Sequence, residues 1–171
     1  MKNFFLGCVA TVLLFGASGI AYLRLGLADV RGDAAPGRLE TLLMHTAVHA
    51  SVRRQAPNVE NPVKPTEENL IAGGKMYLNE CAGCHGTPGT PFKYSGSLNP
   101  PAPTLPEIGT EYSEAQIFWV AKHGIRRTGM FANGVWDPDQ KLWTIAAYIY
   151  RIRNLPPRVS AEIEKAAKSN S

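Results

Sequence analysis

The longest apolar stretch of the chain lies near its N-terminus. Residues 4–23 form a run of twenty residues without a charge. A helix of that length can cross a hydrocarbon core of about 30 Å at about 1.5 Å per residue. The apolar region of a cleaved signal peptide is shorter, about 7–15 residues. The pattern therefore predicts a single transmembrane helix, an uncleaved membrane anchor, within residues 1–28.

Two alternatives to a simple anchor remain open. The small residues Ala17-Ser18-Gly19 are compatible with signal cleavage, and Phe5-Leu6-Gly7-Cys8 weakly resembles a lipoprotein acylation site. The apolar run continues well past Cys8, however, whereas an acylated cysteine should end it. We therefore interpret Cys8 as a buried membrane cysteine.

A second helical pattern occupies residues 38–54, within a linker that spans residues 29–65. Its apolar positions recur at helical spacing: Leu39, Leu42, Leu43, Thr46, Ala47 and Ala50. They predict an amphipathic helix that packs on the following domain, on a partner subunit or at the membrane surface. His45 and His49 on this helix have the i, i+4 spacing of a metal pair, but no third ligand is nearby, so the pair alone does not predict a metal site.

Three further helices are expected in residues 66–156. Thr66 is a candidate N-cap for a helix that runs to about residue 82, and Ser113 is one for a helix that runs to about residue 122. Residues 139–153 carry apolar side chains in helical register, and Gly73 and Gly74 would let this last helix approach the first closely. These patterns predict an all-α domain over residues 66–156, followed by a polar C-terminal tail over residues 157–171.

Composition excludes one class of partner and favours a cofactor. The chain has 171 residues and a net charge of +4, and the surplus charge is spread along its length. No basic stripe of the kind that binds nucleic acid is present. Sixteen glycines and thirteen prolines indicate a loop-rich domain, which suits a small fold wrapped around a large apolar group.

The candidate chemistry is concentrated in Cys81-Ala82-Gly83-Cys84-His85. Two cysteines three residues apart, with a histidine directly after the second, are the attachment motif of a c-type haem. On a helix, positions i, i+3 and i+4 share one face, so both sulfurs can reach one porphyrin while the imidazole faces its iron. A zinc site would need a second ligand pair, and a thioredoxin-like dithiol would need a βαβ setting. We therefore predict one covalently bound haem c, with His85 as an iron ligand.

The loop after the motif contains the expected partner of the His85 ring. The second ring N–H of a ligating histidine usually donates a hydrogen bond to a carbonyl or carboxylate. A carbonyl at or near Pro100 or Pro101 is the predicted acceptor. Alternatively, these prolines only stiffen the loop. The haem propionates need hydrogen-bond donors, for which Trp136 is the best candidate. Two other aromatic residues are alternatives, or are core residues instead: Tyr94 and Trp143.

Met130 is the predicted sixth ligand of the iron. It lies in a turn-rich, unperiodic loop, residues 124–138, where a methionine that only fills the core is less expected. Met1, Met44 and Met76 are excluded by position, and His/Met ligation is common in cytochromes c. His123, which would give a bis-histidine iron, and an open sixth site remain alternatives.

Residues 66–156 resemble class I cytochrome c. The resemblance rests on Gly-x-x-Tyr before Cys-x-x-Cys-His-Gly, on Thr128-Gly129-Met130, and on a C-terminal helix ending Ala146-Ala147-Tyr148-Ile149. It implies three main helices around one haem, thioethers from Cys81 and Cys84, and His85 and Met130 as axial ligands. Family members often have proline directly after the methionine, where this chain has Phe131.

With the anchor and the linker, the chain is similar to membrane-bound monohaem cytochromes of bacteria. The resemblance implies an electron carrier rather than an enzyme, in the cytoplasmic membrane, with its haem domain on the periplasmic side. The expected partners are protein redox complexes that it meets freely or in a fixed assembly as the cytochrome subunit of a dehydrogenase or reductase. A haem enzyme or gas sensor with a labile methionine is the alternative from another class.

Overall fold

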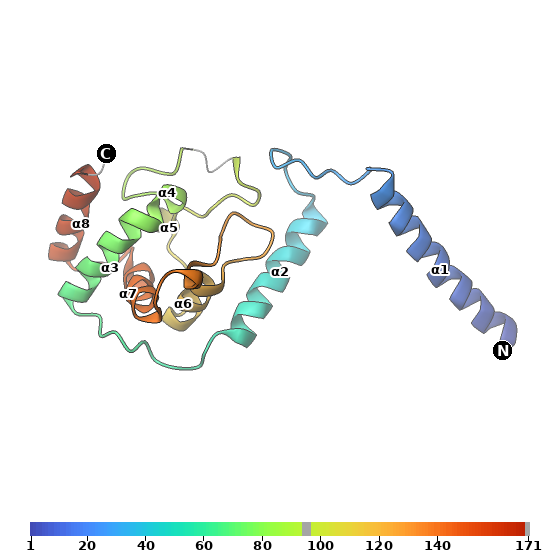
Figure 1. Cartoon of the computed structure of the whole chain (residues 1–171), viewed down its shortest axis with the longest axis horizontal. Coiled ribbons are helices and arrows are strands. Elements are labelled where there is room, and N and C mark those ends of the chain that lie inside the picture. Colours follow the sequence, from blue (N-terminus) through green and yellow to red (C-terminus); the bar gives the residue numbers. More distant parts are fainter. Residues whose placement is uncertain (94–96, 170–171) are drawn as a thin grey trace. The chain divides into compact units, whose positions relative to one another are not determined.

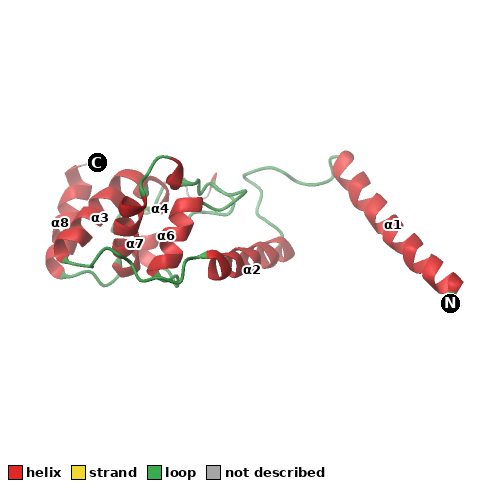
Figure 2. Ribbon diagram, turned by 60° about the horizontal axis from the view of Figure 1, so that its bottom comes forward, coloured by secondary structure: helices red, strands yellow, loops and turns green. Residues whose placement is uncertain are grey.

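The structure is a computed structural model that describes residues 1–93 and 97–169. The chain divides into two compact units, Met1–Ala34 and Ala35–Ser171. Within the described residues the regular elements are helices, with one isolated bridge between Thr87 and Thr90 (Figures 1 and 2). The prediction of an all-α chain is confirmed. The elements are α1 (Lys2–Arg24), α2 (Arg38–Gln55), α3 (Glu67–Glu80), α4 (Ala82–His85), α5 (Leu105–Ile108), α6 (Glu114–His123), the 3₁₀ turn η2 (Asn133–Val135), α7 (Asp139–Arg151) and α8 (Pro157–Ser169).

Helix α1 covers the predicted apolar run. Its 23 residues correspond to about 35 Å of helix at about 1.5 Å per residue, and none of them is buried within the protein. Within the described part of the chain it is the one helix long and apolar enough to cross a membrane.

Helices α3, α6 and α7 form the core of the second unit. The predicted caps are present: the Thr66 side chain accepts a hydrogen bond from the Asn69 N–H at 3.3 Å, and Ser113 forms a capping box with Gln116. These caps satisfy backbone N–H groups that the first turn of a helix leaves free. Helix α7 lies between the other two and contributes more buried side chains than any other helix. Its buried side chains run continuously from Leu142 to Ile149.

The two glycines of α3 set how closely the helices pack. A Cβ at Gly73 would overlap the backbone carbonyl of Thr144 on α7 and lie 3.0 Å from Tyr148 Cβ. A Cβ at Gly74 would overlap the side chain of Ile163 on α8. The expected close approach of α3 and α7 is therefore observed, because only a residue without a side chain fits at position 73.

Residues 157–169 form helix α8 rather than the predicted polar tail. Figure 1 shows α8 beside α3, and the two helices are in contact. Val159 and Ile163, four residues apart on one face, are buried, at 0% and 1% exposure. Arg158 also forms an ion pair with Glu67 on α3 at 3.1 Å. Because most side chains in residues 157–169 are polar, the short apolar stripe of Val159 and Ile163 was not recognised in the sequence. Helix α3 covers this stripe.

Helix α2 forms where predicted, but a different side of it is covered. The side chains that α2 buries lie near its C-terminal end, with Val52 only 1% exposed. The predicted apolar side is open to solvent, as the exposure of Leu39, Leu42 and Leu43 shows. Contact between α2 and α6 accounts for the covered side.

Candidate functional site

The Cys-x-x-Cys-His motif begins where α3 ends. The Cys81 N–H donates to the Tyr77 carbonyl at 2.8 Å, and the N–H groups of Cys84 and His85 donate to the Cys81 carbonyl at 3.0 and 2.9 Å. The backbone thus continues as the short helix α4, Ala82–His85. Helical geometry places the two sulfurs and the imidazole on one side of this turn. Both thiols are partly buried and unpaired.

The ring of His85 is oriented by a carbonyl in the proline-rich loop. Its Nδ1 lies 2.9 Å from the carbonyl oxygen of Pro103. Since a carbonyl can only accept, Nδ1 carries the hydrogen, which leaves the lone pair of Nε2 free for a metal. Burial lowers the pKa of His85, and the bond to Pro103 opposes this only in part. The acceptor was predicted at or near Pro100 or Pro101, and the structure places it at Pro103, two residues beyond Pro101.

The environment of Cys81 disfavours a dithiol redox site. Burial, with smaller contributions from the carboxylates of Glu80 and Asp137, raises the pKa of the Cys81 thiol to about 12. Lys141 pairs with both carboxylates, at 2.7 Å for Asp137. A reactive redox cysteine needs a lowered pKa, so the surroundings of this thiol do not favour disulfide exchange.

Tyr77 fastens the end of the motif to α3. Its side chain is fully buried, and its hydroxyl donates to the Gly86 carbonyl at 2.8 Å, with the His85 carbonyl at 3.3 Å. Burial raises the pKa of Tyr77 well above its ordinary value, so the hydroxyl remains a donor. From the sequence, this residue was placed only in the Gly-x-x-Tyr pattern before the motif. Tyr77 lies eight and nine residues before His85 and Gly86, and this spacing is the sequence feature that could have indicated the hydrogen bonds.

The Met130 loop is a tight, internally bonded turn. The Ile125 N–H donates to the Met130 carbonyl at 2.9 Å, and the Thr128 hydroxyl donates to the Ile125 carbonyl at 2.8 Å. The same hydroxyl accepts from the Met130 N–H at 3.0 Å. Gly124 has a φ of +65°, and a Cβ there would lie 2.5 Å from the Met130 carbonyl oxygen. The Met130 backbone is therefore fixed by hydrogen bonds at both its N–H and its carbonyl, and Gly124 packs closely against that carbonyl.

The proline-rich loop and the Met130 loop, which both follow the motif in sequence, meet in space. A Cβ at Gly129 would lie 3.2 Å from the side chain of Leu98 in the proline-rich loop. The loop of the His85 partner and the loop of Met130 are therefore neighbours. Met130 itself is partly buried, and Phe131, the residue that departs from the family pattern, is 53% exposed.

The remaining predicted residues differ in their surroundings. Trp136 is 65% exposed, with its ring 6.0 Å from that of Phe131. Trp143 is a core residue, because it is buried and stacks on Phe118 at a centroid distance of 4.0 Å. His123, the alternative ligand, is exposed and lies beside Trp119. Tyr94 lies outside the described residues.

The histidine pair of α2 forms an aromatic cluster. The rings of His45 and His49 are 4.1 Å apart, and that of His49 is 5.1 Å from Tyr112. Within residues 1–93 and 97–169, no three His, Cys, Asp or Glu side chains gather as metal ligands would. The cluster attaches α2 to the segment before α6.

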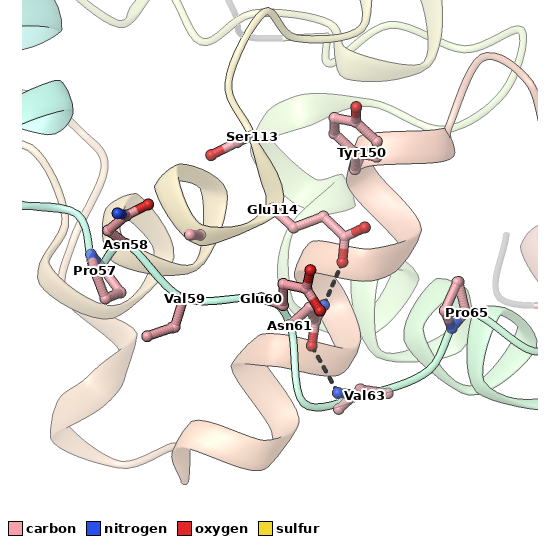
Figure 3. A pocket seen from close by; sticks show the side chains of 11 residues that line it. Pro57, Asn58, Val59, Glu60, Asn61, Val63, Pro65, Ser113, Glu114 and Tyr150 are labelled. Carbon is pink, nitrogen blue, oxygen red and sulfur yellow. Dashed lines mark hydrogen bonds between the residues drawn. The ribbon is translucent and has the colours of Figure 1, made fainter.

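A groove of about 540 Å³ lies away from the motif (Figure 3), and no residue of the motif or of the Met130 loop lines it. Its polar groups bind one another. Asn61 donates to Glu114 at 2.5 Å and to the Trp143 carbonyl at 3.0 Å, and it accepts from the Val63 N–H at 2.8 Å. Glu114 also pairs with Arg151 at 2.7 Å. These bonds fasten the linker to α6 and α7, which gives the groove a structural role.

The donor set fits a covalently attached haem. Two unpaired thiols and an imidazole lie on one turn, and that imidazole presents Nε2 because Nδ1 is bound by Pro103. A thioether donor, Met130, is held in a neighbouring loop. A thiol pair, an imidazole and a thioether are together the groups that a His/Met-ligated haem c requires.

Comparison with known proteins identifies a related family. The family model described as cytochrome c oxidase, cbb3-type, subunit III matches residues 68–149. The matched segment begins in α3 and ends in α7, so it contains the cysteine motif and the Met130 loop. Neither the curated proteins nor the solved structures contain a significant match.

Proposed function

Residues 68–149 form a c-type cytochrome domain, whose cofactor is covalently bound haem c, and from this premise we propose that the chain is a membrane-anchored one-electron carrier. The single observation that carries the proposal is the pairing of a fixed His85 Nε2 with a thioether held in a neighbouring loop. Such a pair would supply two protein ligands to a haem iron.

Each residue then has a defined task. Cys81 and Cys84 form the two thioether bonds, which prevent loss of the cofactor. His85 binds the iron through Nε2, with Pro103 holding the ring. The Met130 sulfur would supply the second protein ligand of the iron. When bound, the haem would supply the one-electron couple, and a thioether ligand beside the imidazole would raise its reduction potential.

A closed sixth position separates a carrier from an enzyme. Substrate or gas binding needs a vacant or labile position, whereas electron transfer needs none. Thr128 and Gly124 hold the Met130 backbone from two sides, which favours a ligand that stays bound. This arrangement supports electron transfer over a haem enzyme or gas sensor.

The N-terminal helix supports an anchored location. Helix α1 is apolar and of membrane-spanning length. Because bacterial c-type haems are attached outside the cytoplasmic membrane, we place the haem domain on the periplasmic side. The description of the matching family names an oxidase subunit. It supports a fixed place in a redox complex, whereas an anchor alone would also allow free diffusion between complexes.

The test is the optical spectrum of the purified holoprotein. We expect the far-red band that a methionine–iron bond gives in the oxidised state, and we expect it to disappear in Met130→Ala. Met44→Ala is the matched control, because Met44 is exposed on α2, and it should leave the band unchanged. Rapid carbon monoxide binding by the reduced native protein would instead indicate an open site and contradict the carrier function.

A further inference from the structure

Helix α2 has two distinct sides. At about 100° per residue, His45, His49, Val52 and Ala56 lie on one side. Val52 is 1% exposed, and the His49 ring lies 5.1 Å from that of Tyr112. This side attaches α2 to the cytochrome domain, through contact with α6 and the segment before it.

An adjoining side of α2, in its first two turns, is apolar and uncovered. Leu39, Leu42 and Leu43 are 68%, 63% and 59% exposed, and no other described residue covers them. They lie in the first two turns of α2, whereas the covered side chains lie in its later turns. Neighbouring apolar side chains left in water on one face mark an interaction site.

The position of these leucines in the chain favours a lipid surface as the partner. Helix α1 ends at Arg24 and α2 begins at Arg38, so residues 25–37 separate them. A flexible linker of that length has a root-mean-square span of about 20 Å. An anchor in the bilayer would thus keep the leucines close to lipid. A short flexible linker gives such a tethered contact an effective concentration of millimolar order.

The charges near the leucines suit a largely apolar contact. Asp29 and Arg31 pair with each other at 2.9 Å, and Asp33, Arg38 and Glu40 are the remaining charges in residues 25–40. Positive and negative side chains therefore nearly cancel, and there is no polybasic patch that would require anionic lipid. Between α1 and α2, three further apolar side chains are exposed as well: Leu25, Leu27 and Val30.

We propose that the side of α2 formed by Leu39, Leu42 and Leu43 rests on the outer surface of the bilayer. The inference rests on the proposed anchoring by α1. Helix α2 then joins two surfaces, the membrane through its leucines and the cytochrome domain through Val52 and His49. The haem domain is held in one orientation above the membrane instead of moving freely on a linker.

A spin-label experiment on the full-length holoprotein in phosphatidylcholine vesicles tests this. In a Cys8→Ser background, with Cys81 and Cys84 consumed by the haem, a label is placed at Leu43→Cys or at Thr41→Cys. Both native residues are exposed, and they lie about 160° apart around the helix axis. We expect the label at 43 to collide several-fold more with oxygen than with a water-soluble nickel reagent, and the label at 41 to show the reverse.

The outcomes separate this inference from the anchoring. A chain that does not float with vesicles overturns both. A chain that floats, but whose labels at 43 and 41 are equally accessible to nickel, overturns the bilayer contact alone. Spin–spin broadening at 43 that grows with the protein-to-lipid ratio would instead show a second copy on this face, and would also overturn it. Replacing Leu39 and Leu42 by serine should raise nickel access at 43 and leave the haem spectrum unchanged.

Discussion

The His85 imidazole donates from Nδ1 to the carbonyl of Pro103, eighteen residues further along the chain, at 2.9 Å. This bond selects the tautomer whose Nε2 can bind iron, and it fixes the plane of the ring. The acceptor belongs to a loop whose other part contacts the Met130 loop, through Leu98 and Gly129. The segments that would hold the two axial ligands are therefore linked through the protein itself.

Tyr77→Phe tests the support of the motif. The substitution leaves the buried Gly86 carbonyl without the hydroxyl that now lies at 2.8 Å. Leaving a buried acceptor unsatisfied costs about 1–3 kcal/mol, so we expect the free energy of unfolding to fall by that amount. Guanidinium denaturation followed by circular dichroism measures it. Tyr150→Phe, at a residue 53% exposed, should leave the midpoint unchanged, and equal midpoints for both variants would contradict the role of Tyr77.

Thr128→Val tests the support of Met130. The Thr128 hydroxyl accepts from the Met130 N–H at 3.0 Å and donates to the Ile125 carbonyl at 2.8 Å, and valine retains the shape without either bond. We expect the methionine–iron bond to open more often, so that the reduced holoprotein binds carbon monoxide several-fold faster than the native protein. Stopped-flow absorption measures the rate.

Thr128→Ser is the control for this prediction, because it retains the hydroxyl. It should restore slow carbon monoxide binding. If Thr128→Val and Thr128→Ser bind carbon monoxide equally fast, the hydroxyl does not position Met130.

Gly73→Ala tests the contact between α3 and α7. A Cβ at this position meets the Thr144 backbone carbonyl, which cannot rotate away as a side chain can. Overpacking of this kind costs about 1–3 kcal/mol, and we expect a lower melting temperature and a reduced yield of holoprotein. Gly83→Ala is the matched control within the motif. No protein atom lies within 4 Å of a Cβ there, and position 83 points away from the side that carries the cysteines and His85.

The attachment of α2 should weaken in acid. Burial, followed by the charges of His45 and Arg53, lowers the pKa of His49 from its ordinary value of 6.5, and Glu111 opposes this only weakly. The unfolded state then binds more protons than the folded state as the pH falls below about 6.5. The free energy that holds α2 in place therefore decreases in acid and is restored above that pH. We expect faster hydrogen exchange in residues 48–56 at pH 5.5 than at pH 7.5, after correction for the intrinsic rate.

His49→Gln is the control for the acid effect, because glutamine does not titrate in this range. The pH dependence of exchange should largely disappear in this variant, while the haem spectrum stays the same. Identical protection at both pH values in the native protein would contradict a role for His49 in holding α2.

The sequence predicted the helices and the chemistry better than it predicted their neighbours. The cap at Thr66, the capping residue Ser113 and the periodic apolar positions of α7 were readable because they are local. The proline-rich loop has no period, so the sequence indicated only a carbonyl at or near Pro100 or Pro101, and the structure identifies Pro103 as the acceptor. Helix α8 was missed because Val159 and Ile163 are few among polar residues, and only contact with α3 buries them.

By itself the sequence determined the cofactor class, the all-α character and the apolar N-terminal run. Each of these depends on residues close together in the chain, as in the motif from Cys81 to His85. Tertiary structure decided which carbonyl orients His85 and which side of α2 is covered. Both depend on contacts between segments far apart in sequence, where the geometry of packing, and not local periodicity, selects the partner. The leucines of α2 remain exposed because α6 and Tyr112 lie against the later turns of the helix, beyond the turns that carry the leucines.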